Sequence, residues 1–156
     1  MKLIQGVAVL GLIVPGAPSF AQKQSPESDA LAAACGQTDP NRPMSDLSPA
    51  ESRAFIICLQ RNAVADFRRR LPTRVDDSTT LMDVTVEGAI AIYHMKVDVD
   101  VALVPMSAIT SLKQATREHA CSDTGMNNTI ALGGGYRYIW TDKNGAVIGE
   151  TTIDSC

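Results

Sequence analysis

The stretch YRYIWT (136–141), DKNG (142–145) and AVIGETTI (146–153) decides the fold of the last third of the chain. Its two outer runs are rich in aromatic and β-branched residues, which favour a pleated, half-buried surface. Between them, Asn144-Gly145 is the residue pair typical of a tight turn. We therefore expect a β-hairpin, with Cys121 before it and Cys156 after it.

Alternation along the first arm places the aromatic rings Tyr136, Tyr138 and Trp140 on one face of the strand. The chain has one Trp and three Tyr, so this face carries three of its four such rings. We expect it to be a core face, and the alternative is an aromatic binding platform.

Residues 1–21 have the pattern of a secretory signal peptide. Lys2 gives a basic start, an apolar run follows, and small residues, Ser19 and Ala21, stand at the minus-three and minus-one positions. No cysteine at the cleavage point offers a lipid anchor, and the apolar run is short for a membrane span. We expect cleavage after Ala21 and a periplasmic or extracellular protein without stable membrane insertion.

The charge and the cysteines agree with export. Loss of Lys2 moves the formal charge from −3 to −4, and this mildly acidic balance argues against a nucleic-acid partner. Four cysteines in an oxidising compartment indicate disulfides, and without a C-x-x-C motif neither a redox pair nor a zinc site is supported. Three connectivities are possible. We predict Cys35–Cys58 and Cys121–Cys156, because each bond would fasten a terminal segment to a neighbouring helix.

Helix signals are strongest at Ser48-Pro49-Ala50-Glu51, which is a capping box with proline at the first helical position. A helix over 49–70 would bury one apolar stripe. The stripe consists of Phe55, Ile56, Leu59, Ala63, Phe67 and Leu71. A shorter helix from Ser25 to Cys35 and a loop over 37–47 precede it. We expect a tail over 22–47 and a single domain over 48–156.

Two further strands and one helix complete the expected fold. Strands are predicted over 81–87, with Met82, Val84 and Val86 on one side, and over 89–104, where residues alternate apolar and polar. A helix over 105–120 and a short helical turn in 123–132 follow. The predicted fold class is α+β, with an antiparallel sheet of about four strands, two hairpins, helices on one face and two disulfides.

Candidate site residues form two groups. The first is a basic cluster at the end of the long helix, expected to be a solvated helix end, with an anion or membrane-surface patch as the alternative. The second lies on the polar side of the 89–104 strand, expected to be a solvated face, with acid–base chemistry or binding of a divalent cation by its carboxylates as the alternative. These candidates are Arg68, Arg69, Arg70, Arg74, His94, Lys96, Asp98 and Asp100. Asp98 and Asp100 are expected to share one strand face. No metal or cofactor motif is present: the glycines at 133–135 lack the lysine of a phosphate-binding loop.

The sequence thus predicts a non-catalytic exported module that binds another macromolecule of the envelope or outside the cell, as an inhibitor, adaptor or accessory subunit. The alternative is a small hydrolase-like enzyme that uses His94 with Asp98 or Asp100.

Overall fold

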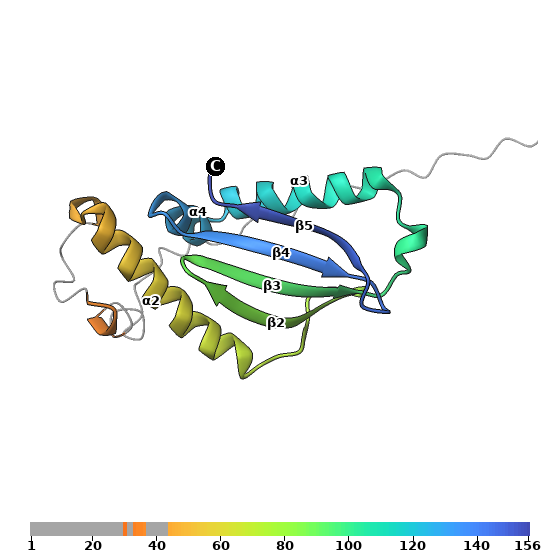
Figure 1. The fold of residues 1–156 in the computed structure, drawn as a ribbon, viewed down its shortest axis with the longest axis horizontal. Helices are drawn as coiled ribbons and strands as arrows, with labels where there is room; N and C mark the ends of the chain where they lie inside the picture. Colours follow the sequence, from red (N-terminus) through yellow and green to blue (C-terminus); the bar gives the residue numbers. More distant parts are fainter. Residues whose placement is uncertain (1–29, 31–32, 37–43) are drawn as a thin grey trace, which may run out of the picture.

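The computed structural model describes residues 30, 33–36 and 44–156 of the chain. A five-stranded sheet forms one layer and the helices form the other (Figure 1). The strand order is β1-β2-β3-β4-β5. The strands are β1 (Thr73–Arg74), β2 (Thr79–Glu87), β3 (Ile90–Val97), β4 (Gly135–Thr141) and β5 (Val147–Ile153). This confirms the α+β class.

The sheet differs from the prediction in strand number and in one pairing. It has five strands instead of about four, and β3 pairs parallel with β4, whereas the other neighbours are antiparallel. A parallel neighbour requires a long crossover connection. Here the connection consists of η2 (Val101–Leu103), α3 (Met106–Ser122) and α4 (Thr124–Ala131), which return the chain to the edge where β3 begins.

The β4–β5 hairpin is confirmed, with Tyr136 opposite Ile153 and a register shift at Trp140/Thr141. In its turn Gly145 has a φ of +90°, a conformation that glycine adopts without the steric penalty of a Cβ.

The β2–β3 hairpin corrects two expectations. A bulge between Leu81 and Asp83 leaves Leu81 and Val84 buried and Met82 44% exposed, so Met82 does not share the core side with Val84. Moreover, β3 ends at Val97, so residues 98–104 do not continue the strand. The polar Asp98 and Asp100 lie in the segment that leads to η2, and their alternation with valines there is not strand periodicity.

The long helix α2 (Pro49–Arg68) begins with the predicted capping box, since the Ser48 side chain accepts from the Glu51 N–H and the Glu51 carboxylate accepts from the Ser48 N–H. Only part of its apolar stripe is covered. Phe55 and Ile56 are buried, whereas Ala63 is exposed and Phe67 is 40% exposed. The stripe prediction was therefore wrong at its C-terminal end.

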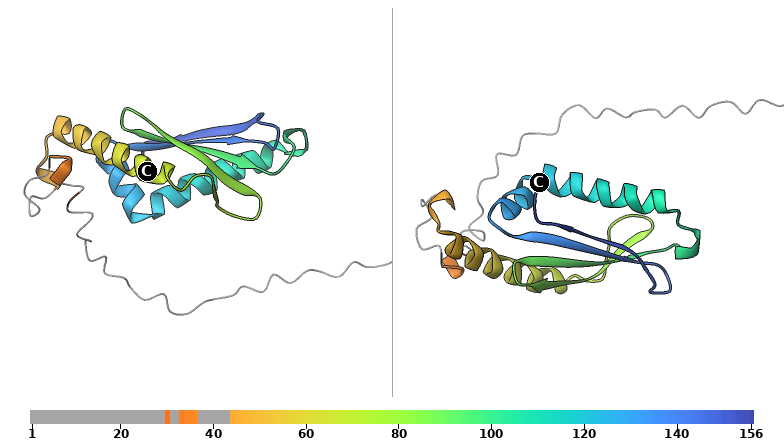
Figure 2. Two further views of the ribbon diagram at one scale, coloured as in Figure 1. Left: turned by 90° about the horizontal axis from the view of Figure 1, so that it is seen from below. Right: turned by 45° about the horizontal axis from the view of Figure 1, so that its top comes forward.

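Helices α2, α3 and α4 lie on the same face of the sheet (Figure 2). Helix α2 contacts β2 and β3, α3 contacts β5, and α4 contacts β4. The predicted disulfides are confirmed: Cys35 is bonded to Cys58 and Cys121 to Cys156, with Cα–Cα distances of 5.5 and 5.6 Å. The predicted signal peptide and the start of the short first helix lie outside the described residues. Of the predicted loop over 37–47, residues 44–47 are described, and they include η1 (Met44–Asp46).

Candidate functional site

A row of four aromatic rings crosses the helix face of β3 and β4. Tyr93 lies between Tyr136 and Tyr138, with ring-centroid distances of 6.2 and 5.0 Å, and Tyr138 stacks on Trp140 at 5.9 Å. We call these four residues the aromatic floor. Trp140 and Tyr136 are buried, whereas Tyr93 and Tyr138 are half-buried. The row is therefore core at its ends and partly open in its middle.

The helices above the floor diverge. Helix α2 lies over β2 and β3, and α3 lies over the opposite edge at β5 (Figure 2). Two cavities occupy the space between them. The first, of about 280 Å³, is bounded by α2, α4 and the floor. The second, of about 460 Å³, is bounded by α3, the loop before β2 and the floor. The stacked pair Tyr93–Tyr138 lies between them, since each cavity is lined by one ring of the pair. We call the two neighbouring cavities together the groove.

Apolar side chains of both helices form the walls of the groove. From α2 come Ile56, Leu59, Ala63, Val64 and Phe67. From α3 come Leu112 and Ala115, with Thr116 and His119 beside them. The uncovered Ala63 and Phe67 therefore belong to a continuous apolar stripe of which one edge packs on the sheet and the other faces the groove.

The tyrosine hydroxyls of the aromatic floor are neutral. Burial raises the pKa of Tyr93 to about 12, with a smaller contribution from the nearby Tyr136, and burial likewise raises the pKa of Tyr138. Burial also raises the pKa of Tyr136, against the opposing effect of a hydrogen bond with Thr129. Buried Gln60 donates through Nε2 to the Gly135 carbonyl at 3.1 Å, while its Oε1 has no hydrogen-bond partner. The cavity beside α2, which has no charged residue in its lining, favours an uncharged, mainly apolar ligand, whereas the cavity beside α3 also has Asp76 and His119 in its lining.

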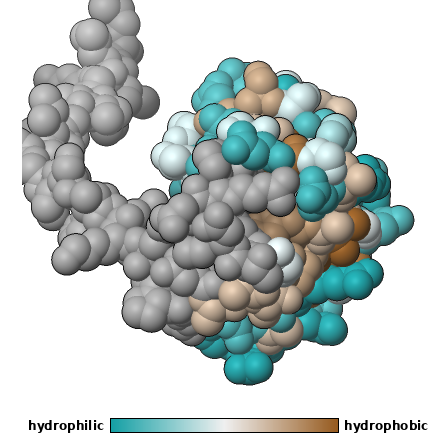
Figure 3. All heavy atoms as spheres, turned by 90° about the vertical axis from the view of Figure 1, so that its left-hand side faces the viewer, coloured by the Kyte–Doolittle hydropathy of each residue, from teal (hydrophilic) through white to brown (hydrophobic). Residues whose placement is uncertain are grey.

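Hydrophobic residues also reach the surface at the end of the molecule where α2 begins. Seen from this end, they form a tan and brown band between hydrophilic residues (Figure 3).

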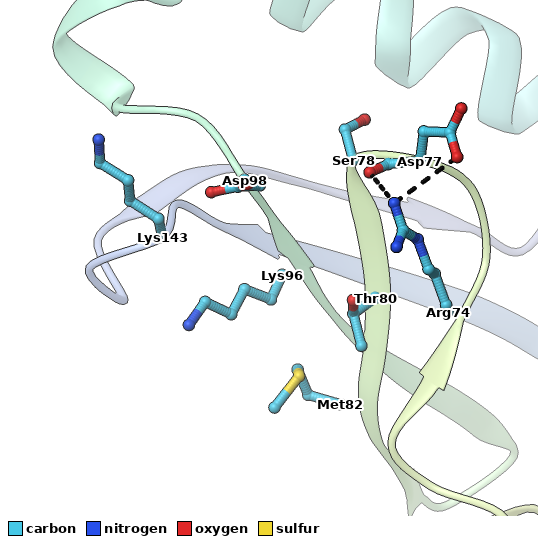
Figure 4. A pocket seen from close by; sticks show the side chains of 8 residues that line it. All are labelled: Arg74, Asp77, Ser78, Thr80, Met82, Lys96, Asp98 and Lys143. Atoms are coloured by element: carbon cyan, nitrogen blue, oxygen red, sulfur yellow. Dashed lines mark hydrogen bonds and ion pairs between the residues drawn. The ribbon is translucent and has the colours of Figure 1, made fainter.

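A second, polar pocket of about 430 Å³ lies at the other end of the sheet (Figure 4). It brings together Arg74, Lys96 and Asp98 of the predicted candidates, and adds Lys143 from the β4–β5 turn. Arg74 is turned toward its own loop, where it donates to the carbonyl oxygens of Asp76 and Asp77. The pocket is an open, mixed-charge surface without a buried polar group aimed into it.

The remaining basic candidates do not converge. Arg68 forms a two-bond ion pair with Asp83, at 3.1 and 3.3 Å, and Arg69 pairs with Asp66 at 3.2 Å. The Arg70 guanidinium lies 5.7 Å from the Phe67 ring centroid. These exposed side chains have separate partners, so the structure brings no anion site together at this helix end.

The residues of the hydrolase-like alternative are also apart. His94 lies on the helix-free face of β3, with its Nε2 atom 3.4 Å from Thr85 Oγ1. Asp100 accepts from the Ala102 N–H and caps η2, and Asp98 is exposed beyond the end of β3. Neither carboxylate is a partner of His94. The described residues include no group of three His, Cys, Asp or Glu side chains that could hold a metal ion.

Sequence reasoning missed the groove and its polar group Gln60. The only signal was an apolar stripe on α2 together with an aromatic face on β4, and each reads as core when taken alone. Whether helices cover the aromatic face completely depends on the angle between α2 and α3. No local sequence pattern encodes that angle.

Comparisons with known proteins support the fold. No protein-family model matches the chain, and no curated protein sequence matches it. A solved structure from Pseudomonas aeruginosa, described as a candidate secreted protein, is 20% identical, with a TM-score of 0.58 over 67% of this chain and 93% of that one.

Two pilotins of type II secretion systems have the same fold. EpsS of Vibrio vulnificus is 17% identical, with a TM-score of 0.57 over 67% of this chain and 92% of its own. AspS of Vibrio cholerae is 16% identical, with a TM-score of 0.54 over 67% and 93%. Within the part of the chain that the structure describes, no helix is both long enough and apolar enough to cross a membrane.

Proposed function

We propose that this chain is an exported, non-catalytic binding protein whose groove receives an apolar segment of another protein of the cell envelope. The observation that carries the proposal is the partly uncovered aromatic floor between α2 and α3, in which Tyr93 and Tyr138 are only half-buried. Soluble proteins cover their large apolar surfaces unless a partner does so, and aromatic residues dominate the energetics of protein interfaces.

The shape of the groove favours a peptide segment over a small molecule. Its two cavities follow one another along four stacked or tilted rings, so it is elongated, and each cavity has a helix as one wall. A segment with apolar side chains at helical spacing would place successive anchors in the two cavities, as in other helix-in-groove complexes. The signal-peptide pattern and the two disulfides support an extracytoplasmic location. The pilotins with this fold are parts of type II secretion systems, which supports a protein partner in the envelope.

Site-specific photocrosslinking tests the position of the partner. A photoreactive phenylalanine analogue at Phe67, 40% exposed in the groove wall, should crosslink the partner in intact cells. The same analogue at Met82 is the matched control, because Met82 is 44% exposed but lies outside the groove. Crosslinks at Met82 but not at Phe67 would contradict the proposal.

The crosslinked segment then allows a quantitative test. Synthesised as a peptide, it should bind the oxidised protein, and Phe67→Asp should weaken binding by a factor of roughly 30 or more, because a central aromatic anchor contributes about 2 kcal/mol or more. Met82→Asp should leave affinity unchanged. Calorimetric titration measures both, and equal affinities for the wild type and Phe67→Asp would contradict the role of the groove.

A further inference from the structure

One end of the molecule displays an unusual loop. Residues 101–106 read VALVPM and are all apolar. Within them Leu103 is 82% exposed and Met106 is 75% exposed, the largest exposed fractions among the big hydrophobic side chains of the described chain. We call residues 101–106 the apolar tip. It consists of η2 and the start of α3, which form the right-hand end of the molecule in Figure 1.

The apolar tip is held in place by the core and by a buried carboxylate. Val101 and Val104 pack against the core cluster, so only the outward side of the tip is bare. The carboxylate of Asp142, 1% exposed, accepts from the Val101 N–H at 3.3 Å. The neighbouring Lys143 N–H donates to the Val99 carbonyl at 3.1 Å. Leu103 and Met106 are therefore presented to solvent by a fixed loop with a network of hydrogen bonds behind it.

Two free ammonium groups lie at the same end. Lys143 belongs to the turn that is bonded to the tip, and Lys96 lies near the end of β3 (Figure 4). Among the described residues neither lysine has an ion-pair or hydrogen-bond partner. Carboxylates also lie at this end. Asp98 is exposed, Asp77 pairs with Arg74, Asp100 caps η2, and Asp142 is buried behind the tip.

We propose that the apolar tip inserts reversibly into the surface of an anionic lipid bilayer, with Lys143 and Lys96 beside the lipid phosphates. A convex end with two projecting apolar side chains can insert into the deformable interface of a bilayer. A protein partner would instead need a pocket that matches the shape of this end. Apolar insertion and attraction of cations to anionic lipids act together at such interfaces. This contact with the bilayer is a peripheral one and does not span the membrane. It does not involve the groove, which lies between α2 and α3.

Vesicle binding of the oxidised protein, purified without detergent, tests the proposal. The protein should sediment with vesicles in which a third of the phosphatidylcholine is replaced by phosphatidylglycerol, and bind pure phosphatidylcholine more weakly. Leu103→Asp should reduce binding by about tenfold or more, because the inserted leucine is lost. Lys143→Glu should reduce binding to anionic vesicles by about fivefold or more and leave binding to pure phosphatidylcholine unchanged. Added salt should also weaken binding to anionic vesicles.

Val75→Asp is the matched control, since Val75 is 57% exposed on a different loop and the charge change is the same. It should bind as the wild type does. Leu103→Trp gives an independent readout: its fluorescence should shift to the blue on anionic vesicles, over the constant signal of Trp140, which is only 3% exposed. Absence of vesicle binding by the wild type, or equal losses in Leu103→Asp and Val75→Asp, would overturn the proposal. Neither result would affect crosslinking at Phe67.

Discussion

At the scale of single residues, Asp142 connects two loops that are far apart in sequence. Its Oδ1 accepts from the N–H groups of Asn144 and Ala146, both at 2.8 Å, and its Oδ2 accepts from Val101. Burial disfavours the charged carboxylate, but these backbone donors outweigh that effect and lower the pKa of Asp142. The sequence predicted the turn from Asn144-Gly145, yet a bond to a residue 41 positions earlier depends on the tertiary fold.

Replacement of this carboxylate should destabilise the protein in a pH-dependent way. Asp142→Asn places an N–H₂ group against backbone donors, so the melting temperature at pH 7 should fall. The pKa of Asp142 is lower in the folded state than in the unfolded state, where it is about 3.8. The ionised carboxylate therefore stabilises the wild type fully above pH about 3.8, and this stabilisation is lost as the pH falls through the pKa of the folded state. The difference in melting temperature should therefore narrow below that pH. Asp98→Asn, at an exposed carboxylate, is the control and should change little; a gap that stays constant with pH would refute this account.

At the scale of elements, α2 shows what a sequence pattern can and cannot predict. Its start followed from a capping box, which involves only neighbouring residues. Its stripe was identified correctly as apolar, but apolarity does not say which neighbour covers it. Phe55 packs with Ile56 and Ala89 in the core, whereas Phe67 faces the groove. The part of the stripe that no element of the fold covers forms a wall of the candidate site. Such exposed apolar residues are expected at a binding site, because they are kept for a partner instead of for the core.

Alanine substitutions along α2 should reveal this division. Phe55→Ala should lower the free energy of unfolding by roughly 3–5 kcal/mol, since a buried aromatic side chain is lost and a cavity remains. Phe67→Ala should cost about 1 kcal/mol or less, because much of its ring is already in water. Arg61→Ala, at an exposed position, should stay within about 0.5 kcal/mol. Urea unfolding measures all three, and a loss at Phe67 as large as that at Phe55 would mean that the groove closes in solution.

At the scale of the whole molecule, the class, the terminal hairpin and both disulfides were predictable, because each has a compositional or local signal. The way in which the two hairpins join into one sheet was not predictable. The sequence located the connecting helices but could not tell that they carry the chain back to pair β4 parallel with β3. The groove arises from that crossover, since it places α3 over β5 and leaves the rings of β3 and β4 between two separate helices.

The second disulfide fastens this arrangement at its end. Cys121 is in the last turn of α3 and Cys156 follows β5, so the bond joins the crossover helix to the edge strand. Replacing both cysteines by serine should cost about 3–4 kcal/mol on the chain-entropy estimate, for a sequence separation of 35 residues. The loss should appear in urea unfolding, and amide exchange should quicken at the end of β5 near Ile153. Removing Cys35–Cys58 should leave exchange in β5 close to that of the wild type. Unchanged exchange at β5 without Cys121–Cys156 would show that the packing of Ile153, which is fully buried, holds the strand by itself.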